Sequence, residues 1–386
     1  MTESYLPFAR PHLEEAEIQE VVDSLRSGWI TTGPKVQRFE KDFAAFLETP
    51  FALGVSSATA GLHLALLALG VGEGDEVITT PMTFVATVNA ILMAGGTPVL
   101  ADVDPRTWNI SPEEVERRIT PKTKGILPVH FTGRPCDMKK LNDIAEKHDL
   151  FILEDAAHAL GSRIEGEHVA RGKGRKRMGV FSLHPAKNIT TGEGGMVCTE
   201  DEDLAESVSI LRQHGMSKGA WKRFSSSGTP EYDVLLQGWK ANMMDIQAAL
   251  GLHQLPRLEE FNRIRRQIVG RYLRELEGCP GLELPAPEEK GTLHAWHIFT
   301  PLVLEKRRSA LIEHLRNLQI GTGIHYIAVH CYKYYQDRFG WHREEFPQAT
   351  RISDAILSLP LFPDMSENEI SRVIRGVRSF FEGTSA

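Results

Sequence analysis

Hydrophobic and polar positions in the first half of the chain follow two alternating patterns. Short, continuously apolar runs of strand length lie at residues 51–57, 75–80, 97–103, 123–130 and 150–156. Longer runs with helical periodicity lie between them, at residues 58–70, 84–96, 111–119 and 138–148. Strands that alternate with helices predict βαβ units around a mostly parallel sheet. Because the strands are apolar throughout, we expect helices to cover both faces of this sheet.

The flanking segments predict a larger and a smaller domain. Helices are expected at 10–27, ended by Gly28, and at 35–48, with a loop over 28–35. After the alternating region come strands at 178–184 and 194–199, a helix at 201–214, a polar loop at 216–237, and a helical pattern at 242–277 that Pro256 interrupts. The segment 280–292 is rich in Pro and Gly, and beyond it we expect strands at 294–304 and 321–327, a helix at 308–318 and a C-terminal helix. This organisation predicts domains at 1–255 and 256–386.

Composition and charge narrow the class of protein. The chain has 386 residues and a formal net charge of -7, so it lacks the basic surplus of a nucleic-acid-binding protein. It has no apolar run long enough for a membrane span and no apolar region near its start that would mark a secretory signal. Its four cysteines are scattered without metal-ligand spacing, so we expect no metal site and reduced thiols in a cytoplasmic protein. The basic run 171–177 is interpreted as a solvated loop, with a contact to a nucleotide phosphate as the alternative.

Three polar features follow predicted strands, where ligands bind in open parallel sheets. The stretch "SSATAG" (56–61) precedes a helix and offers hydroxyl and N–H groups to an anion, or simply caps that helix. Asp155 ends an apolar strand, where a carboxylate either has a cationic partner or caps the next helix. Lys187 lies in the polar turn "FSLHPAKNITTGEGG" (181–195), either as a reactive amine or as a surface lysine.

Taken together, the three features match the needs of pyridoxal phosphate. Its aldehyde forms a Schiff base with a lysine, its phosphate needs hydroxyl and helix N–H groups, and its ring nitrogen needs a carboxylate to stay protonated. The order and placement of the features therefore predict a pyridoxal-phosphate enzyme.

Longer stretches resemble the DegT/DnrJ/EryC1/StrS family of sugar aminotransferases over nearly the whole chain. They include "SGWITTGPKVQRFE", "VSSATAGLHLAL", "LEDAAHALG", "FSLHPAKNITTGEGGM", "DIQAALGLHQL" and "HAWHIF". The resemblance implies the type I aspartate aminotransferase fold, with a mixed, mostly parallel sheet in the large domain and a smaller α+β domain. Within the family, "GTGIHYIAVHCYKYY" and "LSLPLFPDM" resemble most the UDP-4-amino-4-deoxy-L-arabinose–oxoglutarate aminotransferases.

The resemblance also implies roles for individual residues. Lys187 would form the Schiff base and Asp155 would pair with the ring nitrogen. The remaining cofactor contacts would come from Thr59, Ala60, Phe84, His158, Ser182 and Asn242. Asn242 would reach the phosphate of the neighbouring subunit, which implies a homodimer with composite sites. Packing in the core is the alternative for Phe84.

Substrate contacts are expected from two loops at the mouth of the site. The candidates are Trp29, Thr31, His325, Tyr326 and His330. The implied reaction moves the amino group of glutamate to the keto carbon of a nucleotide-linked sugar, with release of 2-oxoglutarate. A 4-keto UDP-sugar is the favoured acceptor, and a 3-keto sugar, a 6-deoxy-4-keto sugar or a keto-cyclitol are the alternatives. The alternative from another functional class is a non-catalytic relative of the same fold. Such a protein would not need Lys187 and Asp155, and both are present.

Overall fold

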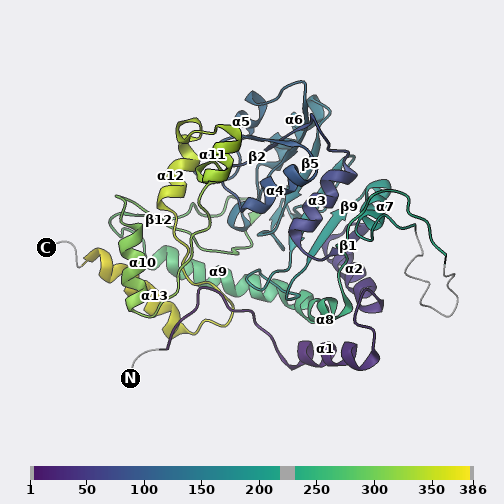
Figure 1. Ribbon diagram of the computed structural model, residues 1–386. Coiled ribbons are helices and arrows are strands. Elements are labelled where there is room, and N and C mark those ends of the chain that lie inside the picture. Colours follow the sequence, from purple (N-terminus) through teal and green to yellow (C-terminus); the bar gives the residue numbers. More distant parts are fainter. Residues whose placement is uncertain (1–3, 218–230, 383–386) are drawn as a thin grey trace.

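The structure is a computed structural model that describes residues 4–217 and 231–382 (Figure 1). Its centre is a seven-stranded sheet with the order β1-β9-β8-β5-β4-β2-β3. The strands are β1 (Phe51–Val55), β2 (Glu76–Thr79), β3 (Thr97–Leu100), β4 (Thr123–Leu127), β5 (Phe151–Asp155), β8 (Arg177–Ser182) and β9 (Gly195–Thr199). Strand β9 is antiparallel to both of its neighbours, and all other pairs in this sheet are parallel. The predicted mostly parallel, mixed sheet is therefore confirmed.

Helices cover this sheet, as its apolar strands require (Figure 1). The helices of this part are α1 (Glu15–Ser27), α2 (Pro34–Leu47), α3 (Ala58–Ala68), α4 (Val85–Met93), α5 (Pro112–Arg117), α6 (Met138–Lys147), α7 (Glu202–Leu211) and α8 (Asp245–Gln254). Helix α1 lies outside the others, against α8 (Figure 1). Helix α3 packs closely on the sheet at Gly61, where a Cβ atom would lie only 2.9 Å from Val180 Cγ1. This close approach places the first turn of α3 beside the ends of the central strands.

Part of the C-terminal region has a core of its own. It contains α9 (Leu258–Glu275), α10 (Arg308–Asn317), α11 (Lys333–Phe339), α12 (Pro347–Ala355), α13 (Glu367–Glu382) and the short pair β10 (Leu282–Glu283) and β12 (Leu302–Val303). Strand β11 (Thr292–Leu293) joins the hairpin of β6 (Arg163–Ile164) and β7 (Glu167–His168) instead. Side chains of α9, α10 and α13 share one buried cluster, to which Leu6 from the N-terminal segment also belongs. In contrast, α11 and α12 pack in a cluster shared with residues of α4 and β3. The predicted boundary between residues 255 and 256 stays a prediction.

The helical pattern at 242–277 divides as expected near Pro256. Helix α8 is followed by a 3-10 turn at Leu255–Arg257, and α9 continues from Leu258. Gly28 ends α1 in the left-handed conformation, with a φ of 74°.

Two predicted strands are wrong. In 294–304 only Leu302–Val303 forms a strand, and 321–327 has no strand beyond a single bridge between Gly323 and Ser358. Both segments are rich in apolar residues because they are buried or line a cavity, and burial alone does not distinguish a strand from an irregular segment. Residues 218–230 of the loop predicted at 216–237 lie outside the described residues.

Candidate active site

A cavity of about 430 Å³ opens where the parallel strands end. Strands β1, β5 and β8 run in the same direction, so their C-terminal ends meet at one edge of the sheet. Ser57, Asp155 and Ser182 line the cavity from these ends, and His297 and Tyr326 close it from the C-terminal part of the chain. The sheet topology therefore brings together residues that lie far apart in the sequence.

Asp155 is the last residue of β5, and its residue surface is only 5% exposed. Thr87 Oγ1 donates to its Oδ2 at 2.8 Å, and the Ala157 N–H donates to its Oδ1 at 3.1 Å. Burial raises the pKa of Asp155, while these two hydrogen bonds and the charge of Lys187 oppose the rise. A cationic partner inside the cavity would therefore stabilise the buried carboxylate of Asp155.

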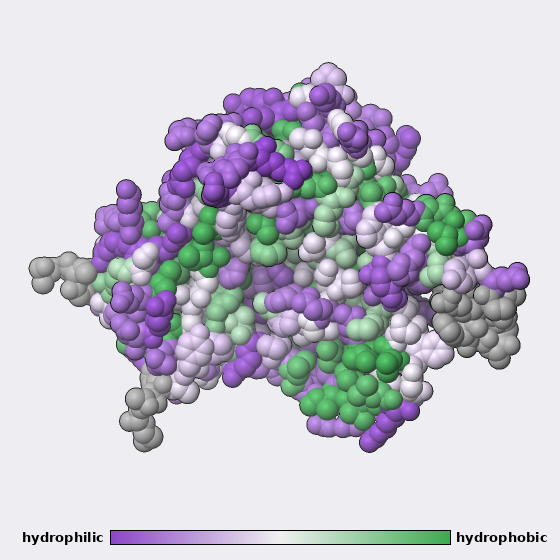
Figure 2. Space-filling view, viewed as in Figure 1, coloured by the Kyte–Doolittle hydropathy of each residue, from purple (hydrophilic) through white to green (hydrophobic). Residues whose placement is uncertain are grey.

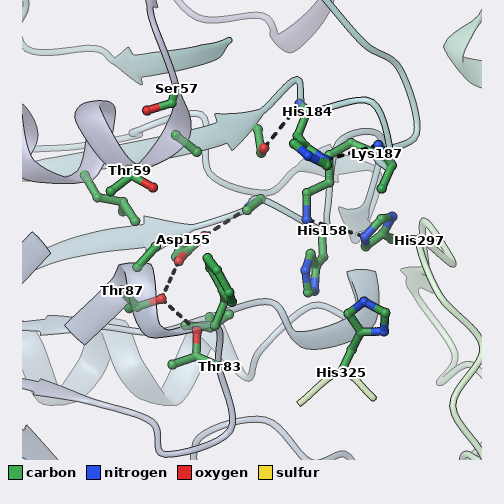
Figure 3. A pocket seen from close by; sticks show the side chains of 18 of the residues that line it. Ser57, Thr59, Thr83, Thr87, Asp155, His158, His184, Lys187, His297 and His325 are labelled. Atoms are coloured by element: carbon green, nitrogen blue, oxygen red, sulfur yellow. Dashed lines mark hydrogen bonds between the residues drawn. The ribbon is translucent and has the colours of Figure 1, made fainter. Parts of the chain in front are cut away.

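Lys187 lies in the turn after β8 and directs its amine into the same cavity (Figure 3). Burial lowers the pKa of Lys187 to about 8, although the charge of Asp155 opposes the shift. The amine lies within hydrogen-bond distance of His297 Nε2, at 3.4 Å. A lysine with this pKa is neutral often enough near pH 7 to act as a nucleophile or a base.

Hydroxyl groups line the cavity near the first turn of α3, and Figure 3 shows Ser57 and Thr59 on the side away from Lys187. Ser57 and Thr59 lie at the N-terminus of α3, and Ser182 lies at the end of β8. Ser57 also caps the helix, since its Oγ accepts the Ala60 N–H at 3.1 Å. The N-terminus of an eleven-residue helix beside three hydroxyl groups suits a phosphate group.

Aromatic rings form the remaining walls. Phe84 is the residue before α4 and is 55% exposed, so the alternative of core packing is wrong for it. His158 is buried, and its Nε2 lies 3.0 Å from the hydroxyl of Tyr326. Phe8 stacks on His325 with ring centroids 4.9 Å apart. Flat apolar walls of this kind accommodate an aromatic ring.

Three histidines of the cavity, His158, His297 and His325, are uncharged at neutral pH. Burial lowers the pKa of His158 well below its ordinary value, and the charge of Lys187 lowers it further. The same two causes, in the same order, lower the pKa of His325 to about 4. These three neutral imidazole rings therefore lie around the amine of Lys187 and the buried carboxylate of Asp155.

The donor set fits pyridoxal phosphate. The cavity contains an amine for its aldehyde, a buried carboxylate for its ring nitrogen and hydroxyl groups at a helix N-terminus for its phosphate. Lys187, Asp155, Thr59, Ser182, Phe84 and His158 all line this one cavity, as do His325 and Tyr326.

The other candidate residues lie elsewhere in this single chain. His330 is fully buried away from the cavity, where its Nε2 lies 2.8 Å from Thr350 Oγ1. Trp29 donates from Nε1 to the Thr32 carbonyl, and Thr31 is exposed. Ala60 is not among the residues that line the cavity, and its N–H is engaged by Ser57.

Asn242 does not line the cavity of its own chain. Its Nδ2 donates to Thr32 Oγ1 at 2.5 Å, and its Oδ1 accepts from Lys240 Nζ at 2.6 Å. The expected contact of Asn242 with the site of a second subunit stays a prediction.

Sequence reasoning missed several residues of the cavity. Phe8 reaches it because the N-terminal segment is bound beside residues 319–321, through the Leu6 N–H to the Gln319 carbonyl and the Gly321 N–H to the Leu6 carbonyl. Thr87 and His297 were missed as well. His297 lies in the stretch "HAWHIF", which was noted for its resemblance to the family. For His297 this motif was the available signal, because periodicity does not show which buried residue faces a cavity.

The basic run 171–177 does not line this cavity. Lys173 pairs with Glu167 at 2.7 Å and Lys176 with Asp149 at 2.9 Å, which agrees with the interpretation as a solvated loop. Arg177 does not agree with it, because this residue begins β8 and is buried, with Nη1 donating to the Leu150 carbonyl at 3.1 Å. Within residues 4–217 and 231–382, no cluster of His, Cys, Asp or Glu could hold a metal ion. Over the same residues, no helix is both long and apolar enough to cross a bilayer.

Comparison with known proteins gives matches over almost the entire chain. The model of the DegT/DnrJ/EryC1/StrS aminotransferase family matches residues 11–378. The spore coat polysaccharide biosynthesis protein SpsC of Bacillus subtilis is 46% identical, with 98% of each chain covered.

Solved structures of similar proteins have the same fold. A proposed sugar aminotransferase of Streptococcus pneumoniae, Spr1654, superimposes in its PLP-form with a TM-score of 0.91 and 32% identity, covering 99% of this chain and 100% of that one. PseC of Helicobacter pylori, an aminotransferase involved in the biosynthesis of pseudoaminic acid, superimposes with a TM-score of 0.90 and 29% identity, covering 99% of this chain and 100% of its own. These likenesses confirm the predicted fold and cofactor.

Proposed function

The chain belongs to the DegT/DnrJ/EryC1/StrS aminotransferase family, and from this premise we propose that it transfers the amino group of glutamate to the 4-keto carbon of a UDP-linked sugar. The observation that supports amino transfer is the meeting of Lys187 and Asp155 in one cavity that Ser57, Thr59 and Ser182 also line. A non-catalytic relative would have no need to keep this set together.

The cofactor supplies an electron-withdrawing ring and a carbon that carries the amino group between the two substrates. Thr59 and Ser182 would hold its phosphate, and Asp155 would hold the proton on its ring nitrogen. Because burial makes an isolated carboxylate costly, Asp155 gains by pairing with that protonated nitrogen.

Lys187 is the proton carrier of the reaction. With its pKa lowered to about 8, its neutral amine accepts the proton that leaves the α-carbon of glutamate, and the resulting ammonium returns a proton during product formation. When the sugar is aminated, the same atom works in the reverse direction.

The acceptor would enter on the side of Phe8, His325 and Tyr326. His325 is held by Ser358, with Nδ1 and Oγ 2.9 Å apart, so its other ring nitrogen is available to a sugar hydroxyl. Phe8 offers a flat apolar surface to the sugar ring. A 6-deoxy-4-keto sugar, a 3-keto sugar and a keto-cyclitol remain the alternative acceptors.

A homodimer is part of the proposal. Figure 2 shows a hydrophobic surface over α1 and α8, to which the exposed Ile18, Leu25 and Met244 belong. Surfaces of this kind mark protein contacts. We infer that a second copy covers this face, so that Asn242 of each chain reaches the cofactor phosphate of the other.

Two relatives support a proposal about the role in the cell. SpsC is named for spore coat polysaccharide biosynthesis, and PseC for the biosynthesis of pseudoaminic acid. We propose that this chain likewise makes an amino sugar for a cell-surface polysaccharide. The four cysteines are free thiols, in keeping with a reducing, cytoplasmic location.

A single-turnover acceptor screen tests the proposed substrate. Glutamate first converts the bound cofactor to its pyridoxamine form, and 4-keto and 3-keto nucleotide sugars are then added one at a time while the visible absorbance is followed. Recovery of the original spectrum with a 4-keto UDP-sugar supports the proposal. Recovery only with another acceptor refutes the 4-keto UDP assignment, and no conversion by glutamate refutes the donor.

A further inference from the structure

One side chain lies within hydrogen-bond distance of the Lys187 amine. Across the described residues, His297 Nε2 is the one hydrogen-bond partner found for Lys187 Nζ, at 3.4 Å (Figure 3). The two residues are 110 positions apart in the sequence, and His297 is only 4% exposed. Figure 3 shows the amine next to the imidazole, with the contact drawn as a dashed line.

The imidazole of His297 is held by its backbone and by packing. The His297 N–H donates to the Thr132 carbonyl at 3.0 Å, and the His297 carbonyl accepts from Arg265 Nη1 at 3.1 Å. The ring packs against His158 with centroids 4.5 Å apart. Its Nδ1 is buried without a partner in the part of the chain that the structure describes. Among the described residues, the contact with Lys187 is therefore the one polar contact of the His297 imidazole ring.

A lysine needs such a contact when its amine is not bonded to the cofactor. Its side chain has four rotatable bonds, and Asp155 is the buried carboxylate of the same cavity. An ion pair with Asp155 would keep the amine protonated and draw it away from the reacting carbon. We propose that His297 is the positioning residue of Lys187, whose Nε2 accepts an N–H of the free amine and holds it in place for proton transfer.

An imidazole suits this role better than a carboxylate would. Burial, followed by the charge of Lys187, lowers the pKa of His297 well below its ordinary value, so the ring stays neutral. A neutral acceptor orients the amine without the strong preference for the ammonium form that a second carboxylate would create.

The first test measures the acid–base behaviour of Lys187 without any substrate. The full-length chain is freed of cofactor and labelled with acetic anhydride at a series of pH values, and the Lys187 peptide is quantified by mass spectrometry. In His297→Leu the hydrogen bond to the ammonium is lost, so the apparent pKa of Lys187 should fall by about one unit. His297→Asn retains an acceptor atom and should recover part of this shift.

A matched control comes from the same segment. His294 is buried and stacks on Trp296, with ring centroids 3.8 Å apart, but it does not line the cavity. His294→Asn should leave the labelling profile of Lys187 unchanged. If it shifts the profile as much as His297→Leu does, the effect is general loosening and the proposal fails.

The second test uses the enzyme loaded with cofactor. With glutamate, His297→Leu should slow the single-turnover half-reaction by about tenfold to a hundredfold, while the glutamate concentration for half-saturation stays the same. An unchanged labelling pKa in His297→Leu overturns the proposal, whatever the rate. Neither test uses the sugar, so a wrong acceptor assignment would leave the result for His297 intact.

Discussion

Replacing Lys187 with methionine should stabilise the cofactor-free chain and do so in a pH-dependent way. The folded chain lowers the pKa of this lysine from 10.5 to about 8. At about 1.4 kcal/mol per pKa unit, holding the ammonium in the cavity costs at most about 3.5 kcal/mol at neutral pH. Lys187 is partly exposed through the mouth of the cavity, so solvent reduces the expected gain to about 2 kcal/mol.

The sign of the pH dependence follows from proton binding. Below pH 8 the lysine is charged in both the folded and the unfolded chain, and the full cost is present. Between about 8 and 10.5 the unfolded chain binds more protons at this site than the folded chain, so the wild-type chain gains stability as the pH rises. The advantage of Lys187→Met should therefore shrink across this window and vanish above it.

Urea unfolding of the cofactor-free chains at neutral pH and at several alkaline values measures this difference. Lys139→Met is the control, because this lysine is exposed on α6 and its removal should change the free energy of unfolding by less than about 0.5 kcal/mol at every pH. If Lys187→Met is no more stable than the wild type at neutral pH, or if its advantage does not shrink with rising pH, the lysine is not a buried, destabilised amine and the reasoning is wrong.

Four further substitutions test other parts of the site. Lys187→Ala should abolish amino transfer and the visible absorbance of the bound cofactor while circular dichroism stays that of the wild type; retained turnover would exclude its catalytic role. Asp155→Ala should lower turnover by about a hundredfold or more, because the ring nitrogen loses its proton partner; near wild-type turnover would assign that partner to another group. Ser57→Ala removes the cap of α3 and should lower the free energy of unfolding by about 1 kcal/mol and weaken phosphate binding, seen by denaturation and cofactor titration. Asn242→Ala, inactive or weak alone, should regain activity when mixed and refolded with Lys187→Ala, since a mixed dimer would have one complete site; no recovery would argue against composite sites.

Local sequence was sufficient for the reactive centre. Asp155 ends an apolar run and Lys187 lies in a polar turn after another, and both placements follow from the periodicity of the flanking residues. Because parallel strands end at one edge of their sheet, the two residues were expected to meet, and they line the same cavity. The helix N-terminus at Ser57 could be identified in the same way, from hydroxyl residues that precede a helical pattern.

The irregular segments of the C-terminal part were misread for a physical reason. Apolar content at 294–304 and 321–327 reflects burial, and burial is shared by strands and by irregular segments that line a cavity. His330 illustrates the same limit, since its neighbours suggested a binding loop while its side chain is buried against Thr350.

The chain by itself therefore determines the alternation of strands and helices, the positions of Asp155 and Lys187 at strand ends, and the family to which it belongs. Tertiary structure alone decides that Phe8 stacks on His325, that His158 meets Tyr326 and that His297 holds Lys187. These contacts join residues more than 100 positions apart, so they depend on how the C-terminal part packs against the sheet. Periodicity records the local face on which a residue lies, and only packing decides which distant residue it meets there.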